Sequence, residues 1–241
     1  NGIIDEVKIY NTALTPAQVK QEFSLADYGS QFGNSVQMNG VNDHIQMTDF
    51  NLGTSDFTLE TWIKPSVNTD AYLITNRTNE LDATGNWFVL ARFPDGKIRL
   101  ELANAGTPNS NVTYVSNAIT QLGSWSHVAA VRSGTNLTLY INGIAEAIFN
   151  DAFIRNITTG NNIGILGTWA ANGSKYYNGT MDEVRIWNTA RTQTQIVDNM
   201  NSHLTGNETG LVAYYDMNRD GQGAGLTVDN KCTATGAALN G

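Results

Sequence analysis

Cysteine is nearly absent from the sequence, and positive charge is scarce. Cys232 is the only cysteine among 241 residues, so an intrachain disulfide, a cysteine-zinc cluster and a cysteine-pair redox centre cannot form. The 14 lysines and arginines are outnumbered by 22 aspartates and glutamates, which gives a net charge of −8, and they are scattered singly. A nucleic-acid partner needs a continuous basic surface for its phosphates, so we expect no nucleic-acid binding.

Long hydrophobic runs and proline are also lacking. No apolar run approaches the roughly 18 residues of a membrane span, and we expect no membrane insertion. The first residues lack the basic and then apolar profile of a signal peptide, so we expect any secretion signal to lie upstream. With 4 prolines, 23 glycines and abundant asparagine and threonine, the composition favours many turns and short strands. The 41% of hydrophobic residues is enough for a sizeable core.

One segment occurs twice in the chain. The sequence NGIIDEVKIYNTALT at residues 1–15 returns as NGTMDEVRIWNTART at residues 178–192. Because the second copy closes a complete unit, the simplest interpretation is an excerpt from a longer array of similar units. We predict three parts: the closing strand and helix of a preceding unit at 1–26, a complete domain at 27–203, and the lead-in segment of a following unit at 204–241, docked on that domain.

Period-two alternation and turn residues predict the strands. Residues 57–63 alternate apolar with polar or larger side chains, as in a strand with one buried face. The triplet PDG at residues 94–96 suits a tight turn between strands near 87–93 and 97–102. The pair NG at residues 142–143 favours a second hairpin, since both residues tolerate positive φ.

A helix-capping signal follows each copy of the repeat. Thr15 and Thr192 each have a glutamine three residues later, the spacing at which the two side chains satisfy backbone amides at a helix start. After the second copy, Ile196 and Met200 lie four residues apart and would turn one apolar stripe toward a sheet. The predicted fold class is therefore all-β: a two-sheet antiparallel sandwich with short helices after the closing strand.

Four stretches, in order along the chain, resemble the laminin-G-like, concanavalin A-type jelly roll: VQMNGVNDHI at 36–45, DFTLETWIKP at 56–65, 125–131 with 139–143, and YNGTMDEVRIW at 177–187. The resemblance implies a jelly-roll sandwich in a secreted or cell-surface bacterial protein. Such modules are often repeated, or attached to polysaccharide-degrading enzymes, and frequently contain a structural calcium ion. We therefore expect an extracellular or bacterial cell-surface location.

Two functions fit this resemblance. The first is a calcium-stabilised, lectin-like module that binds polysaccharide or glycoprotein glycans within a multidomain adhesin or polysaccharide-processing protein. The alternative is a structural spacer or protein-adhesion repeat that contacts neighbouring domains of the same chain and binds no glycan. A glycoside hydrolase is less favoured, because retaining glucanases of this fold present Glu-x-Asp-x-x-Glu on one strand. Here Glu80-Leu81-Asp82 begins that pattern without its final glutamate, so we expect no enzyme activity.

Sugar sites offer a flat aromatic face together with planar polar groups. A loop rich in small polar residues contains Trp169, Asn172 and Tyr176, and a buried aromatic would be hard to arrange there. We expect these three residues to contact the ligand. Trp87 stands at the entrance of a strand and Tyr72 precedes a polar loop, so we expect both to reach the same rim.

Two sets of residues are candidates for calcium, which binds six to eight hard oxygens. In the first set, Asp216, Asn218 and Asp220 match the opening positions of an EF-hand loop, with Gly221 at its sharp turn. Thr227 stands where that loop ends in glutamate. The segment is therefore at best an incomplete site, and the alternative is a turn without an ion.

The second set combines two ends of the predicted domain. Asn42 and Asp43 lie in the bend after the first strand, and Asp182 lies near the start of the last strand. The family resemblance implies that these two strands lie side by side, which would bring the three side chains together. In the alternative, Asp182 and Glu183 hydrogen-bond to backbone amides or pair with Arg185, and no ion is needed.

Overall fold

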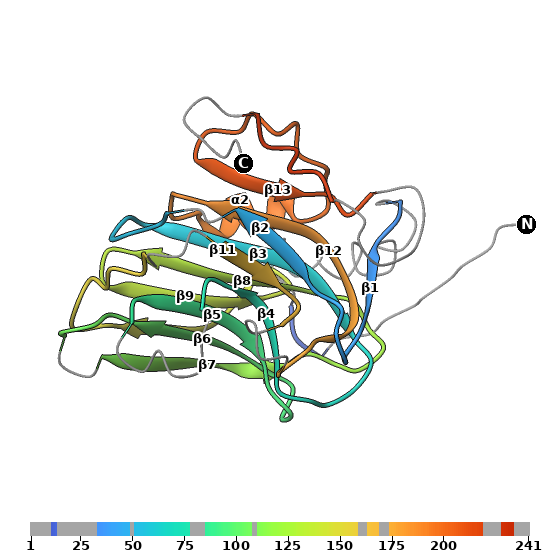
Figure 1. Cartoon of the computed structure of the whole chain (residues 1–241), viewed down its shortest axis with the longest axis horizontal. Coiled ribbons are helices and arrows are strands. Elements are labelled where there is room, and N and C mark those ends of the chain that lie inside the picture. The colour runs from blue at the N-terminus through green and yellow to red at the C-terminus, as the bar shows by residue number, and fades with distance from the viewer. Residues whose placement is uncertain are drawn as a thin grey trace, which may run out of the picture.

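The computed structural model of the protein describes residues 11–13, 33–48, 51–77, 85–107, 110–158, 163–168, 174–218 and 228–233. Within these residues, two antiparallel sheets are accompanied by one short helix (Figure 1). We call the described residues 204–218 and 228–233 the C-terminal segment. The predicted all-β jelly-roll sandwich is confirmed. Most of the first copy of the repeat, and the helix predicted after it, lie outside the described residues.

The larger sheet has seven strands. Its order is β1-β12-β3-β8-β9-β10, and β13 pairs with β12 as well. The bounds of these strands are β1 Val36–Asn39, β3 Phe57–Pro65, β8 Ser126–Ser133, β9 Asn136–Ile141, β10 Ile144–Asn150, β12 Asn178–Trp187 and β13 Leu211–Tyr215.

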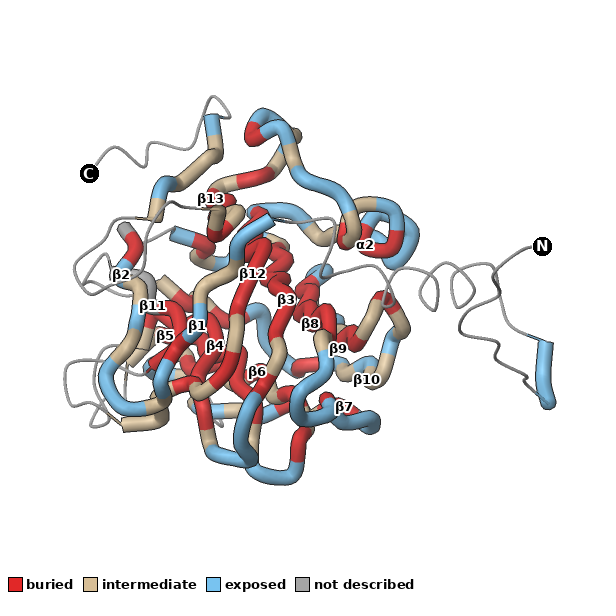
Figure 2. Tube along the Cα trace, turned by 90° about the vertical axis from the view of Figure 1, so that its right-hand side faces the viewer, coloured by how far each residue is buried: buried red, intermediate tan, exposed pale blue. Residues whose placement is uncertain are grey.

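The smaller sheet has six strands in the order β2-β11-β4-β5-β6-β7. Their bounds are β2 Ile45–Thr48, β4 Ala71–Thr75, β5 Trp87–Arg92, β6 Lys97–Ala103, β7 Asn111–Ile119 and β11 Ile163–Leu166. The main hydrophobic core draws on both sheets, for example on Leu59 of β3 and Leu90 of β5. In Figure 2 the buried stretches lie along the strands of both sheets and the exposed stretches lie mainly in the connections.

Both predicted hairpins are confirmed. β5 pairs with β6 across the PDG turn, where Gly96 has a φ of 82°. β9 pairs with β10 across Asn142 and Gly143, whose φ angles are 53° and 74°. A glycine has no Cβ to clash at positive φ, and asparagine tolerates this region better than most residues. The local sequence therefore determines both turns.

The helix α2 (Gln193–Asn199) begins at the predicted capping box. Thr192 Oγ1 accepts a hydrogen bond from Gln195 N at 3.2 Å, and Gln195 Oε1 accepts one from Thr192 N at 2.9 Å. Ile196 is buried and packs against Ala129 and Tyr140 on the outer face of the larger sheet. The predicted apolar stripe of this helix is thus in contact with a sheet.

Both faces of β3 are buried, so the prediction of one buried face was wrong. Phe57 and Leu59 belong to the core between the sheets, but Glu60 and Trp62 on the opposite face are also at most 1% exposed. Trp62 packs against Met200, and its Nε1 donates to the Met200 carbonyl at 2.7 Å. Polar alternation shows which side chains point away from the core, but it does not show that the segment after β12 covers them.

β12 changes its neighbour half-way along one edge. β1 pairs with residues 178–181 and β13 pairs with residues 184–187, while β3 occupies the other edge. The register with β3 is interrupted between Asp182 and Arg185, and Glu183 there has a φ of 50°. Such a bulge bends the strand and re-aims its side chains. The segment at residues 211–215 therefore completes this sheet, while its assignment to a following unit stays a prediction.

Docking of α2 should contribute measurably to stability. We expect Ile196→Ala to lower the free energy of unfolding by about 2–4 kcal/mol, because it removes a fully buried side chain and leaves a cavity against the sheet. Urea denaturation followed by tryptophan fluorescence measures the change. Thr194→Ala, at an exposed position of the same helix, is the control and should change stability by less than about 0.5 kcal/mol. Equal effects of the two substitutions would contradict the packing.

Candidate functional site

The outer face of the six-stranded sheet carries an aromatic cluster. Side chains alternate along β5 and β6, so that Leu90 and Leu100 enter the core while Ala91 and Arg99, paired with each other, lie on the opposite face. We call this surface the aromatic face. Its apolar members are Tyr72, Trp87, Val89, Ala91, Phe93 and Ala103.

The two sheets differ in what packs on their outer faces. On the seven-stranded sheet, Trp187 packs with Leu204 and Cys232 of the C-terminal segment, and α2 covers β8 and β9. The described members of the cluster on the aromatic face come from β4, β5 and β6 and from Phe93, which follows β5. In the described part of the chain, the aromatic face is therefore the sheet surface that a ligand could approach without displacing α2 or the residues around Leu204 and Cys232.

Three cationic side chains lie over the aromatic rings of this face. The Arg77 guanidinium carbon is 4.3 Å from the centroid of the Trp87 ring. Arg99 stacks in the same way on Phe93, at 3.8 Å. Lys175 Nζ is 5.6 Å from the Tyr72 ring and 5.9 Å from the Phe93 ring. These distances are those of cation–π contacts, so the outermost layer of the face is positively charged.

Acidic groups lie beside two of these cations. Asp95 Oδ2 accepts from Arg99 Nη2 at 3.0 Å, and Asp70 contacts the ammonium group of Lys175. Carboxylates at the side of the stacked cations hold them in position over the rings.

Burial changes the ionisation of two further groups on this face. Burial raises the pKa of Glu101 above its usual value, although Arg77 counteracts the effect. Burial, and then the nearby Glu101 carboxylate, raises the pKa of the Tyr72 hydroxyl to about 12. Tyr72 therefore remains a neutral phenol at physiological pH, able to donate a hydrogen bond.

The structure places two of the three described members of the predicted sugar site, Tyr72 and Trp87, in one cluster. Tyr72 and Trp87 lie on the aromatic face, and Arg77 Nη1 reaches the Tyr72 hydroxyl at 3.4 Å. Tyr72 N donates to the Lys175 carbonyl at 3.1 Å. The third member, half-buried Tyr176, is the residue that follows Lys175 in the sequence. Trp169 and Asn172, from the same predicted loop, are outside the described residues, as is the Glu80-Leu81-Asp82 fragment.

The rings of Tyr72 and Trp87 are not an open stacking platform. Each residue is only 2% exposed, because neighbouring side chains, Arg77 among them, cover the rings. A sugar ring could not lie on them without moving these side chains. The cations on this face were not among the predicted site residues. The alternation of charged and apolar residues along 97–102 was the available signal, but it does not indicate which sheet face remains uncovered.

The structure separates the second predicted calcium set. β1 pairs antiparallel with β12, with Val36 opposite Met181 and Asn39 opposite Asn178. Asp182 therefore lies beyond the start of β1, whereas residues 42–43 follow its other end.

Asn42 and Asp43 belong to a hydrogen-bonded turn after β1. Asn39 Oδ1 accepts from the backbone amides of residues 41–43 at 2.8–3.2 Å, and Asn39 Nδ2 donates to Asn42 Oδ1 at 2.7 Å. Asp43 Oδ2 in turn accepts from Asn39 N at 2.9 Å. These contacts are those of an Asx-type turn.

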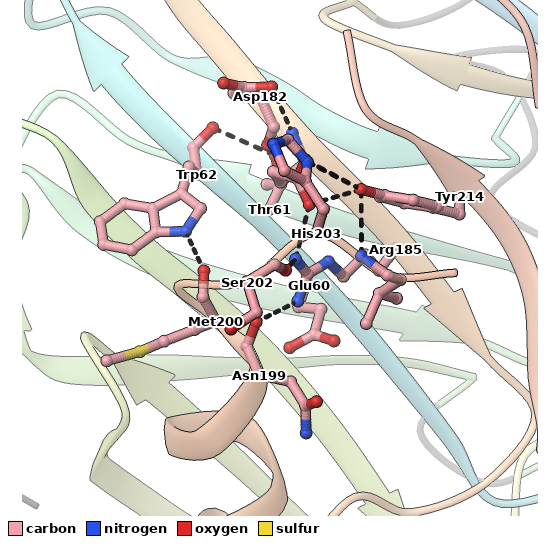
Figure 3. A network of polar contacts seen from close by, with 12 residues as sticks. Glu60, Thr61, Trp62, Asp182, Arg185, Asn199, Met200, Ser202, His203 and Tyr214 are labelled. Atoms are coloured by element: carbon pink, nitrogen blue, oxygen red, sulfur yellow. Dashed lines mark hydrogen bonds and ion pairs between the residues drawn. The ribbon is translucent and has the colours of Figure 1, made fainter. Parts of the chain in front are cut away.

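Asp182 and Glu183 make the contacts expected if no calcium ion is bound: a hydrogen bond to a backbone amide and an ion pair with Arg185. Asp182 Oδ1 accepts from Glu183 N at 2.8 Å. The buried Glu183 carboxylate accepts from Arg185 Nη2 at 2.5 Å and from the Tyr214 hydroxyl at 2.9 Å, and it lies 2.9 Å from His203 Nδ1. Figure 3 shows Arg185, His203 and Tyr214 converging here from β12, the chain after α2, and β13. The network fastens the C-terminal segment to the sheet.

A second buried carboxylate lies under α2. Glu60 accepts from Trp187 Nε1 at 2.7 Å, and its other oxygen is 3.4 Å from His127 Nε2. Burial alone would raise the pKa of Glu60, but hydrogen bonding to His127 and the charge of Arg185 hold it below its usual value. This acid is inaccessible to a substrate, so we assign it to the fold.

The described residues of the first calcium set, Asp216 and Asn218, hydrogen-bond to backbone amides. Asn218 N donates to Asp216 Oδ1 at 3.2 Å, and Asn218 Oδ1 accepts from Asn34 N at 2.7 Å. Asp220 lies outside the described residues. Within the residues that are described, no three acidic, histidine or cysteine side chains gather as a metal site. Calcium binding therefore stays a prediction.

Comparison with known proteins identifies the family. The family model of the concanavalin A-like lectin/glucanases superfamily matches residues 39–197. The chain belongs to this superfamily. No curated protein matches it significantly in sequence. Among the described helices, none is long and apolar enough to cross a membrane.

Solved structures share the superfamily fold at low sequence identity. A candidate carbohydrate-binding protein from Bacteroides ovatus is 19% identical with a TM-score of 0.60; the match covers 81% of this chain and 56% of that one. The CBM40 domain of a Ruminococcus gnavus sialidase, bound to α2,3-sialyllactose, is 15% identical with a TM-score of 0.56 and coverages of 68% and 95%. A heptameric pentraxin from Limulus polyphemus is 20% identical with a TM-score of 0.53 and coverages of 70% and 81%.

The raised pKa of Glu101 leads to a pH-dependent effect of substitution. Above a pH of about 4.5 the unfolded chain ionises this group freely, whereas burial opposes ionisation in the folded state, so the wild-type residue lowers stability as pH rises. We expect Glu101→Gln to increase the free energy of unfolding more at pH 7 than at pH 4. Urea denaturation at both pH values measures this difference.

The control for this substitution is Asp229→Asn, whose side chain is 74% exposed. It should have a similar, small effect at both pH values. A Glu101→Gln effect that is independent of pH, or larger at pH 4, would contradict a half-buried carboxyl group with a raised pKa.

Proposed function

We propose that the protein is a non-catalytic carbohydrate-binding module and that its ligand binds on the aromatic face. The observation that supports this most directly is the contrast between the sheets in the described part of the chain: α2, Leu204 and Cys232 pack on the outer face of one, while the other carries cations and carboxyl groups over its aromatic rings. Aromatic and polar groups that converge on one surface are typical of sugar recognition. Superfamily membership and fold similarity to a CBM40 domain bound to sialyllactose support the same function.

The acidic groups of this face support binding rather than hydrolysis. A retaining glycosidase needs two carboxyl groups about 5–5.5 Å apart, one ionised as nucleophile and one protonated as acid. On the aromatic face, Asp70 and Asp95 are instead paired with Lys175 and Arg99. Such pairs orient the cations, and burial disfavours the ionised form of Glu101, the third carboxyl group described on this face. The described acids of this face therefore support binding rather than nucleophilic attack.

The wider setting is part of the proposal. An extracellular or cell-surface protein with repeated modules, such as an adhesin or a polysaccharide-processing protein, would use this domain to hold a polysaccharide or a glycoprotein glycan. The repeated segment at residues 1–15 and 178–192 is the observation in favour of an array. Neighbouring units of the same chain would then be its other partners.

Binding to a broad glycan panel tests the proposal. We expect the wild-type protein to bind at least one glycan, and we expect Tyr176→Ala, beside the aromatic face, to weaken that binding about tenfold by removing contact area. Calorimetry with the best ligand from the panel gives the affinity. Ile148→Ala, at a 72% exposed position on β10 of the other sheet, is the control and should bind like the wild type. Absence of binding to any glycan would favour the spacer or protein-adhesion role instead.

Calcium binding is tested separately by thermal denaturation. If Asp216 and Asn218 contribute to a calcium site, added calcium should raise the melting temperature and a chelator should reverse the change, because a ligand that binds only the folded state stabilises it. Asp216→Ala should abolish the response, whereas Asp198→Asn, at an exposed position of α2, should retain it. A melting temperature that calcium and chelator leave unchanged would show that these residues form a turn without an ion.

A further inference from the structure

Among the described residues, the accessible cations are concentrated on the aromatic face. Seven described lysines and arginines are not buried, and four of them lie on this face. The four are Arg77, Lys97, Arg99 and Lys175, with Lys97 placed by its alternation with Ile98 along β6. The whole chain has a net charge of −8, so this gathering of positive charge is opposite in sign to the rest of the protein.

The three remaining accessible cations have other surroundings. Arg191 lies 3.9 Å over the Trp187 ring on the opposite sheet, and Lys231 lies 3.7 Å from Asp229 in the C-terminal segment. Lys64 is on β3, in the other sheet. In the described part of the chain, none of these three side chains is placed next to another accessible cation by the contacts given above.

Geometry makes the cations, and not the rings, the groups that a ligand would meet. The rings of Tyr72 and Trp87 are 2% exposed, whereas the side chains of Arg99 and Lys175 are 26% and 28% exposed. The N–H donors of a guanidinium group lie in one plane, which suits the two oxygens of a carboxylate or sulfate group. Asp95 accepts from one nitrogen of Arg99, and a guanidinium has five N–H donors, so donors remain for a further acceptor.

The charge balance of the face is positive despite its acids. Asp70, Asp95 and Glu101 set three carboxyl groups against the four cations. A ligand with carboxylate or sulfate groups would gain charge-assisted hydrogen bonds there. A neutral sugar would gain no such bonds and would find the rings already covered.

We propose that the ligand of the aromatic face is an anionic glycan, whose carboxylate or sulfate groups are bound by Arg77 and Arg99 with Lys175 and Lys97 alongside. This inference rests on the proposed function and names the class of sugar for the same site. Recognition then depends on charge and on the planar geometry of two guanidinium groups, with the aromatic rings acting as the support that holds them.

Matched glycan pairs test the inference. The carboxylate arm compares oligogalacturonate with its methyl ester, and sialyllactose with lactose. The sulfate arm compares a sulfated galactan with its desulfated form. We expect at least one anionic member to bind about tenfold or more tightly than its neutral partner, and added salt to weaken that binding. The arm that responds identifies the anionic group.

Substitutions then locate the site. We expect Arg77→Gln and Arg99→Gln each to weaken binding of the anionic glycan about tenfold, with thermal denaturation confirming that the variants are folded. Lys64→Gln and Lys231→Gln remove the same charge elsewhere and should bind like the wild type. Arg99→Lys keeps the charge but loses the planar guanidinium, so its affinity for the anionic glycan should lie between those of the wild type and Arg99→Gln. If Arg99→Gln fails to fold, Arg99→Lys replaces it in this comparison.

Three results would overturn the inference. Neutral and anionic members of every pair could bind equally, the Arg77 and Arg99 variants could bind like the control variants, or binding could be insensitive to salt. In each of these cases the protein still binds glycans and the proposed function stands. If no glycan of the panel binds at all, the proposed function itself fails, and the inference fails with it.

Discussion

The pairing of β12 with three other strands is the constraint on which the rest of the structure depends. β3 occupies one edge of β12, while β1 and β13 share the other on either side of the bulge at Asp182 and Glu183. Glu183 takes a backbone conformation that is unfavourable for a residue with a side chain. Its contacts with Arg185, Tyr214 and His203 compensate for that cost. The bulge lies where the neighbour of β12 on that edge changes from β1 to β13.

This arrangement determines which surface is open to a ligand. The chain that leaves β12 turns back through α2 across the outer face of the seven-stranded sheet and buries Glu60, Trp62 and Trp187. Those side chains include two tryptophans and an acid, the residue types common in sugar sites, yet they serve as a second core. Among the described residues, the outer face of the six-stranded sheet takes no part in that packing, and its aromatic rings instead support charged side chains that can serve binding.

Stacking of cations on rings gives the aromatic face its character. Arg77 over Trp87 and Arg99 over Phe93 turn apolar surface into a support for positive charge. Carboxylates beside the cations keep them from leaving the rings, and burial favours the neutral form of Glu101. A face built in this way differs from a sugar platform of bare aromatic rings, since its selectivity would come from hydrogen-bond donors that are already oriented.

The sequence alone was sufficient for the local and periodic features. Alternation identified the strands, Pro94-Asp95-Gly96 and Asn142-Gly143 identified two hairpins, and Thr192 with Gln195 identified the helix start, because each depends on residues close together in the chain. It also placed Tyr72 and Trp87 in the candidate site.

Only the tertiary structure decided which outer face is covered, that the Tyr72 and Trp87 rings lie beneath cations, and that Asp182 is remote from Asn42 and Asp43. These features depend on strand order and on packing between distant segments. A bulge at one residue and the return of α2 across the sheet have no signature in the local pattern of hydrophobicity, since they arise only when the strands pair.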